Sequence, residues 1–354
     1  MQKIAAQLGD THTRVSVFSY LTDYPYNFYV NSDGSLYLYQ CSYVDDDMKM
    51  SVIDYYQIVQ INGVDIQYIL DQLEMLSSRA SNQYISGTEF IFGLISRETL
   101  QFIGILCYQQ ADTFTLLDGQ GRTFNIDLVP GEEEMSLNAL VDEDHRREGE
   151  LVPTPSGMLP INLDWVYWYE YLDEEKTMHI IYNMCRDKPE QSFAEMIQEA
   201  FAVMEQNGAQ KLVIDLRNNS GGNSSIADAL YAALLEHPEI AANTYALIGT
   251  RSASSAVMCM IYLSENFDIP LVGTPSGDVP SGFGNTETFT LPNSGVECNY
   301  GTKYFWMSSD IPSLLPSGYP PEWYNTVMPD VYISTDIQDL AEGRDPALEW
   351  VLAQ

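Results

Sequence analysis

The chain is poor in basic residues. Its 354 residues include 16 lysines and arginines against 50 aspartates and glutamates, which gives a formal net charge of −34. A surface of that sign repels nucleic acid and anionic membranes, and we therefore discount both as partners. The chain also lacks an apolar run of the roughly 18 residues that a membrane-spanning helix needs, so we expect no membrane insertion.

Cysteine is scarce as well. The five cysteines are odd in number, widely spaced and form no CxxC or CxxxH pair, so neither a zinc site nor a disulfide framework is indicated. Cys107, Cys185 and Cys259 lie in apolar runs, which predicts core positions for them. The opening residues, MQKIAAQLGD, lack the apolar core of a signal peptide and lead almost at once into a motif. We therefore expect that the chain is cut at its N-terminus.

Hydrophobic residues make up 45% of the chain and charged residues 19%, which is typical of a globular protein. The pattern predicts four parts. They are an N-terminal segment with a histidine motif (1–23), a β-rich domain (24–128), an acidic linker (129–160) and an α/β core (161–354). His145, within the linker, is predicted to be a surface residue.

Part of the β-rich region resembles the latter half of a PDZ-like module. A strand, an Asn-Gly turn and a second short strand span Ile58–Ile66, and a helix is predicted from Tyr68 to Ser77. PDZ modules bind extended peptides by adding a strand to a sheet edge. The alternative is a small β-rich domain without a peptide groove.

Strands and helices alternate after the linker, which predicts parallel strands joined by crossover helices. The predicted strands are 165–171, 177–184, 211–216, 244–249 and 269–273, and the predicted helices are 192–207, 226–236 and 257–265. Ligand sites of such sheets lie beyond the carboxyl ends of the strands. The aromatic run Tyr304–Trp306 is interpreted as core packing, with the lining of a peptide groove as the alternative.

The strand KLVIDL runs into a polar turn that contains Gly221 and Gly222. Glycines allow a sharp turn and leave backbone N–H groups uncovered, and Ser224 or Ser225 is predicted to cap the next helix. N–H groups at a helix start attract a phosphate, a carboxylate or the oxyanion of an acyl-transfer intermediate. An ordinary strand-to-helix turn explains the stretch equally well.

Two further features carry nucleophile chemistry. Ser252–Ser255 opens the predicted helix 257–265, and a serine at a helix start beside a glycine turn suits a nucleophile with an oxyanion hole. Helix capping also favours serine at such a position. His12 lies between two threonines in a turn, where a neighbouring hydroxyl or Asp10 could fix its tautomer. Taken alone, this stretch fits an exposed turn histidine better.

Six motifs stand out in the chain: LGDTHTRV near the start, DLRNNSGG, SASSA opening a helix, LVGTPSG, and MPDVYI and GRDPALE near the end. Together they resemble the peptidase core of the tricorn-like and C-terminal-processing serine peptidases. The resemblance implies an α/β fold with a ClpP/crotonase-like parallel-sheet core, preceded by a PDZ-like module and a linker.

The resemblance also implies site residues. The family nucleophile is a serine at the start of the helix, and the spacing to Gly273 favours Ser254 over Ser255. The processing branch pairs this serine with a lysine, but Val279 occupies the matching position. The tricorn-like branch uses a histidine of the early motif as base, which His12 matches.

The same branch implies two auxiliary residues. Thr11, next to His12, resembles the serine of the tricorn tetrad, and Glu322 is the nearest candidate for its catalytic glutamate. The backbone N–H of Gly221 or Gly222, with that of Ser255, is expected to hold the oxyanion. This mechanism needs no metal or cofactor.

The predicted function is hydrolysis of peptides or unfolded proteins through an acyl-enzyme, and a homo-oligomer remains open. The resemblance favours a location outside the cytoplasm, although the sequence contains no signal peptide. The first alternative is a catalytically silent relative that binds peptides or small molecules. The second, an acyl-CoA enzyme on the same core, is disfavoured because basic residues for the phosphates are few.

Overall fold

The computed structural model describes residues 5, 12–15, 21–43, 50–76, 95–107, 110–133, 135–147, 152–155, 158, 165–305 and 326–354. The strands are β1 (Arg14–Val15), β2 (Asn27–Val30), β3 (Leu36–Tyr43), β4 (Met50–Ile61), β5 (Val64–Asp65), β6 (Asp112–Leu117), β7 (Thr123–Leu128), β8 (Tyr167–Leu172), β9 (Thr177–Tyr182), β10 (Lys211–Asp215), β11 (Thr244–Ile248), β12 (Leu271–Gly273), β13 (Gly282–Thr290), β14 (Glu297–Phe305) and β15 (Val331–Tyr332). The helices are α2 (Ile66–Glu74), α4 (Arg97–Phe102), α5 (Leu137–Leu140), α6 (Phe193–Asn207), α7 (Asp228–Glu236), α8 (Pro238–Ala241), α9 (Ser255–Phe267), α11 (Ile337–Ala341) and α12 (Pro346–Leu352), with 3₁₀ turns η3 (Glu143–His145) and η4 (Ser224–Ala227).

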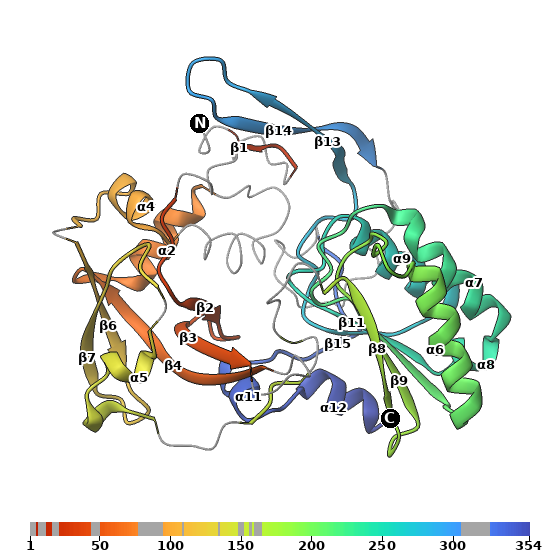
Figure 1. The fold of residues 1–354 in the computed structure, drawn as a ribbon. Helices are drawn as coiled ribbons and strands as arrows, with labels where there is room; N and C mark the ends of the chain where they lie inside the picture. The colour runs from red at the N-terminus through yellow and green to blue at the C-terminus, as the bar shows by residue number, and fades with distance from the viewer. Residues whose placement is uncertain are drawn as a thin grey trace.

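A six-stranded sheet forms the core, in the order β15-β12-β11-β10-β9-β8. Within this sheet β9, β10, β11, β12 and β15 pair in parallel, and β8 joins the edge antiparallel to β9. The helices α6, α7 and α9 cover one face, whereas α12 packs on the other (Figure 1). The predicted α/β class with a parallel core sheet is therefore confirmed.

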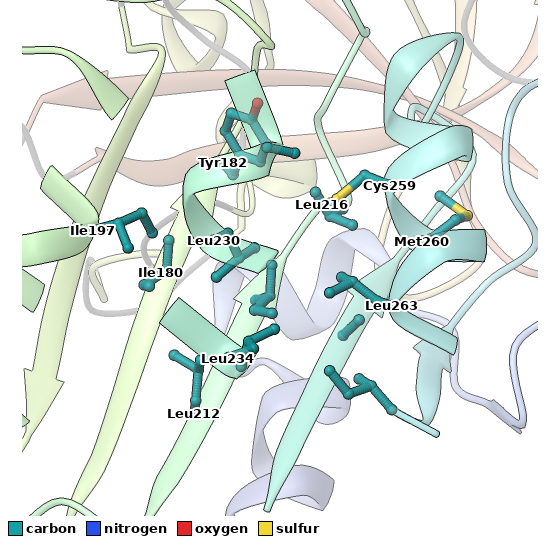
Figure 2. Packing of buried hydrophobic residues seen from close by; sticks show 14 of the residues in the cluster. Ile180, Tyr182, Ile197, Leu212, Leu216, Leu230, Leu234, Cys259, Met260 and Leu263 are labelled. Atoms are coloured by element: carbon teal, nitrogen blue, oxygen red, sulfur yellow. The ribbon is translucent and has the colours of Figure 1, made fainter. Parts of the chain in front are cut away.

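The alternation of side chains along the core strands explains the two covered faces. On β10, Leu212 and Ile214 point into the large cluster under α6, α7 and α9, while Val213 between them contacts the α12 side. Figure 2 shows Leu230 and Leu263, from α7 and α9, meeting the strands in that cluster. Strands buried on both faces read as continuous apolar runs, which is why KLVID was recognisable in the sequence.

The β-rich region forms a separate antiparallel sheet in the order β2-β3-β4-β6-β7. Its β4–β5 hairpin turns through Asn62 and Gly63, both at positive φ (51° and 75°), as an Asn-Gly turn requires. The Asp65 side chain accepts from the N–H of Gln67 and so caps α2, which begins two residues earlier than predicted.

The predicted linker is partly folded onto this sheet, so the expectation of a linker in solvent is wrong for Leu137 and Val141, which are buried. Leu137 in α5 is fully buried in the core of the β-rich sheet. His145 was predicted to be a plain surface residue, but its Nδ1 lies 2.9 Å from Asp118 Oδ2 and its ring stacks on Phe124. These contacts fix the segment through a charged hydrogen bond and ring packing.

A third sheet links the N-terminal segment to the core, in the order β1-β14-β13. The β13–β14 hairpin leaves the core and reaches across to β1 (Figure 1), where Arg14 pairs with Asn299 and Val15 with Cys298. The interpretation of the aromatic run as core packing is wrong for Tyr304, whose side chain on β14 is 46% exposed. Trp306 lies outside the described residues. Within the described part of the chain, no helix combines the length and apolarity needed to cross a membrane.

Candidate active site

The start of α9 holds Ser254 in a strained backbone conformation. Its φ of 54° and ψ of −121° are sparsely populated by residues other than glycine. The neighbouring turn fixes it, because the Ala253 N–H donates to the Asn219 carbonyl at 2.9 Å. A serine on a sharp strand-to-helix turn presents its hydroxyl in the manner of a nucleophile elbow.

His12 meets this serine across 242 positions of sequence, with Nε2 3.4 Å from Ser254 Oγ in a half-buried setting. The pairing of β1 with β14 places the segment that carries the histidine. The distance is long for a hydrogen bond, as is common between a base and a nucleophile before substrate binds. The structure thus brings the predicted nucleophile and base together.

The Ser255 side chain binds the backbone of the glycine turn. Its side chain is buried, with 7% exposed, and its hydroxyl donates to the Gly222 carbonyl at 2.6 Å. This bond ties the first residue of α9 to the glycine turn. The geometry therefore favours Ser254 over Ser255 as the residue able to reach a substrate.

Two backbone N–H groups of the turns around Ser254 have no acceptor among the described residues: those of Gly222 and Ser255. The Gly221 N–H is already used, since it donates to Asn219 Oδ1 at 2.9 Å. The sequence left open whether Gly221 or Gly222 donates to the oxyanion. Among the described contacts, the Gly222 N–H is the one of the two without an acceptor. N–H groups of this kind can stabilise an oxyanion.

Gly221 has a steric role instead. Its φ is 93°, and a Cβ there would lie 2.6 Å from the Ser254 Cβ and 2.9 Å from the Ala253 carbonyl oxygen. Only glycine allows the two turns to approach this closely.

An open cavity of about 520 Å³ borders the glycine turn. Met184 and Ile226 give it apolar walls, and the oppositely charged Arg186 and Asp187 also line it. Its volume exceeds that of a single side chain, so it can accept part of an extended chain.

The other predicted residues have different outcomes. Thr11 and Glu322 lie outside the described residues. The predicted caps of the helix after the glycine turn are wrong, because Asn223 accepts from the Ser225 N–H and the chain first forms η4. That Val279 occupies the position of the lysine of the processing branch stays a prediction from the sequence.

The sequence analysis missed Asn219 and Asp278. Asn219 is fully buried and orders the glycine turn through its side chain. Asp278 is 5% exposed and accepts the Ser254 N–H at 3.1 Å. A signal existed, since a lone aspartate precedes Val279 in a loop of small residues. In the part of the chain that the structure describes, no group of three or more His, Cys, Asp or Glu side chains is placed to hold a metal ion.

Comparisons with known proteins concern one stretch of the sequence and the fold. Residues 181–245, which contain β10 and the glycine turn, match the sequence model of peptidase family S41. No curated protein matches the chain.

Solved structures extend the likeness to the fold. Mature CPAF covers 99% of this chain and 84% of its own at 13% identity, with a TM-score of 0.54. Mature CPAF complexed with lactacystin gives 13% identity and a TM-score of 0.50, with 99% and 85% coverage. The photosystem II D1 C-terminal processing protease gives 13% identity and a TM-score of 0.41, with 98% and 86% coverage. At such identities the CPAF structures show a common fold.

Proposed function

We propose that this chain, whose resemblance to the S41 peptidases is confirmed by the sequence match and the shared fold, is a serine peptidase. The observation that carries the proposal is the 3.4 Å approach of His12 Nε2 to Ser254 Oγ. A histidine beside a strained serine at a helix start suits acyl transfer. The pair is brought together from opposite parts of the chain by a dedicated strand pairing.

The reaction begins with proton transfer. Neutral His12 takes the Ser254 hydroxyl proton on Nε2 while Oγ forms a bond to the scissile carbonyl carbon. The carbonyl π electrons move onto oxygen, where the N–H groups of Gly222 and Ser255 stabilise the negative charge. One such donor is typically worth ~10²–10³ in rate.

Collapse of this intermediate breaks the carbon–nitrogen bond. The leaving amine takes the proton from His12, which leaves an ester between Oγ and the acyl part of the substrate. A water molecule, deprotonated by His12, then attacks the ester, and the returning proton restores Ser254 as the acid product leaves. Thr11 and Glu322 remain predicted auxiliary residues of this step.

Peptides or unfolded proteins are the substrates we infer. The cavity beside Gly222 is open and large enough for part of an extended chain. The related mature CPAF forms a complex with lactacystin, which makes that compound a useful second probe for this site.

The first test is labelling by a fluorophosphonate, which reacts with activated serines. We expect labelling of the wild type at Ser254, loss in Ser254→Ala and His12→Ala, and retention in Ser255→Ala. Intact mass and peptide mapping identify the modified residue. Labelling that vanishes only in Ser255→Ala would overturn the assignment of the nucleophile.

The catalytically silent alternative predicts a different result. A silent binding protein would show no labelling in any variant although all of them melt cooperatively. Peptide binding detected by thermal shift in an unlabelled protein would then favour that alternative.

A further inference from the structure

Asp278 lies directly against the nucleophile turn. Its Oδ2 accepts the N–H of Ser254 at 3.1 Å, and its Oδ1 accepts the N–H of Val279 at 2.9 Å. The side chain is 5% exposed. Hydrogen bonds to an ionised acceptor are about twice as strong as neutral ones, so this carboxylate holds the Ser254 backbone firmly.

The loop that carries Asp278 is itself fixed to the same turn. The Gly277 N–H donates to the Ser252 carbonyl at 2.9 Å, and the Ser276 hydroxyl donates to the Asp278 carbonyl at 2.9 Å. A Cβ on Gly277 would lie 1.8 Å from the Thr250 carbonyl oxygen, so loop and turn are in direct backbone contact. The position of Asp278 is therefore set independently of Ser254.

This contact has two consequences. First, the Ser254 N–H is taken, which leaves the oxyanion to Gly222 and Ser255. Second, the turn is kept in a conformation that is strained for a residue other than glycine. A neutral acceptor would suffice for both, yet the acceptor is a buried carboxylate.

The carboxylate can also act on the chemistry, because it contacts the turn whose Ser254 Oγ lies 3.4 Å from His12 Nε2. Proton transfer from Ser254 turns His12 into an imidazolium, and a nearby negative charge favours that form. The nucleophile turn carries an ionisable side chain of its own, Arg251, which interacts electrostatically with Tyr39 and Tyr29 of the β-rich sheet. Among the described carboxylates, that of Asp278 accepts a hydrogen bond from the turn at Ser254.

We propose that Asp278 is a positioning residue for the peptidase reaction: it holds the Ser254 backbone, and its charge favours the protonated base. The inference rests on the proposed function. It assigns a role within the loop in which the processing branch carries its lysine, although the side chain here has the opposite charge and contacts the backbone N–H of the serine.

The test compares Asp278→Asn, which keeps an acceptor without the charge, with Asp278→Ala, which removes both. We measure the second-order rate constant of fluorophosphonate labelling between pH 5 and 9, the range of about two units on either side of neutrality in which a histidine base titrates. Asp330→Asn is the matched control, because Asp330 Oδ2 also accepts a backbone N–H, that of Leu271 at 2.8 Å, on another segment.

We expect labelling to slow by about 10-fold in Asp278→Asn, as a change of 1.4 kcal/mol would give, and by about 10²-fold in Asp278→Ala, as misplacement of a reacting group gives. The ascending limb of the Asp278→Asn profile should move to lower pH, because loss of the negative charge disfavours the protonated base. Asp330→Asn should follow the wild type.

An Asp278→Asn protein that labels at the wild-type rate with an unmoved limb would overturn the inference. Equal slowing in both variants with an unmoved limb would reduce Asp278 to a structural role and would overturn it too. The near-isosteric asparagine variant decides the matter even where the alanine variant does not fold. Absence of labelling in the wild type would instead contradict the proposed function, so the two failures are distinct.

Discussion

Three neighbours hold Ser254 in its strained backbone conformation. Asp278 and the Asn219 carbonyl accept the N–H groups of Ser254 and Ala253, and Gly221, which has no Cβ, lets the glycine turn pack directly against Ser254. At the scale of single residues, the site therefore depends on positions that take no part in the chemistry. Substitutions at these positions should change reactivity without touching the nucleophile or the base.

Gly221→Ala is the sharpest case. The added Cβ would lie 2.6 Å from the Ser254 Cβ at a φ of 93°, so we expect displacement of the nucleophile and a fall in fluorophosphonate labelling of about 10²-fold. Gly34→Ala is the control, since Gly34 also has a positive φ (83°) but no atom within 4 Å of the added Cβ. Equal labelling of the two variants would contradict this view of Gly221.

Asp54 supplies a prediction about pH. It is 1% exposed on β4, burial raises the pKa of its carboxyl to about 6, and its Oδ2 has no hydrogen-bond partner in the described structure. A carboxyl with a raised pKa in the folded state binds its proton more tightly than in the unfolded state. Its contribution to stability is therefore lost as pH rises from about 4 to 6.

We accordingly expect Asp54→Asn to be more stable than the wild type at pH 8, by about 1–3 kcal/mol, and to lose that advantage near pH 4. Urea unfolding at the two pH values measures the difference. A variant that is less stable than the wild type at pH 8 would show that the carboxylate has a compensating partner.

The sequence predicted the residues of the site better than the groups that support them. Ser254 and His12 carry side-chain chemistry within short motifs, so the sequence could single them out. Asp278 acts through a backbone N–H 24 positions away, a contact that depends on how two loops meet. No local pattern specifies such a contact, although a charged residue among small ones gave a hint.

The hairpin of β13 and β14 is the element that connects the base to the core. Its second strand, β14, lies between β13 and β1 and pairs Asn299 with Arg14 and Cys298 with Val15. These two β1 residues follow His12 by two and three positions. The sequence did not predict this role, because the contact joins positions more than 280 residues apart. The core strands were predictable since burial on both faces leaves continuous apolar runs.

Shortening this hairpin tests its role. Replacing residues 287–300 by an Asn-Gly turn that joins Thr286 to Gly301 removes the partner of β1 and should reduce Ser254 labelling by about 10²-fold, because His12 loses its position. Replacing only 291–296 keeps the Thr290–Glu297 pair and the β1 partner, and this variant should label as the wild type does. Normal labelling of the shorter hairpin would show that His12 is held by other contacts.

At the scale of the whole molecule, the C-terminal segment joins the two large sheets. Ile337 and Leu340 of α11 pack on β3 and β4, and the Tyr29 hydroxyl donates to the Thr335 carbonyl at 2.7 Å. On the core side, Arg217 forms a bidentate bond to Asp345 at 2.8 and 2.7 Å while also contacting Asp215. The motif GRDPALE thus has a structural function that its sequence did not reveal.

Arg217→Met tests this junction. Arg217 is 11% exposed and both of its partners are almost fully buried, so the substitution removes the guanidinium that compensates two buried carboxylates. Breaking a buried pair in this way typically costs about 3–5 kcal/mol, which urea unfolding at pH 7 should detect. Arg344→Met is the control: its exposed ion pairs with Asp339 and Glu349 are screened by water, and we expect no measurable change.

The deficit of Arg217→Met should also depend on pH. Burial by itself raises the pKa of Asp215, but the Arg217 guanidinium and the His179 ring, whose Nε2 lies 3.4 Å from Asp215 Oδ2, outweigh it, and the net pKa is lowered. A lowered carboxyl pKa contributes stability above the unfolded value near 4, and this contribution is lost as the pH falls further. The wild type should therefore lose stability below about pH 4, while the variant, whose carboxylates gain protons readily, should converge on it. A deficit that stays constant down to pH 3 would mean that the guanidinium contributes through packing alone, since a lost ion pair must titrate with its carboxylate over about this range.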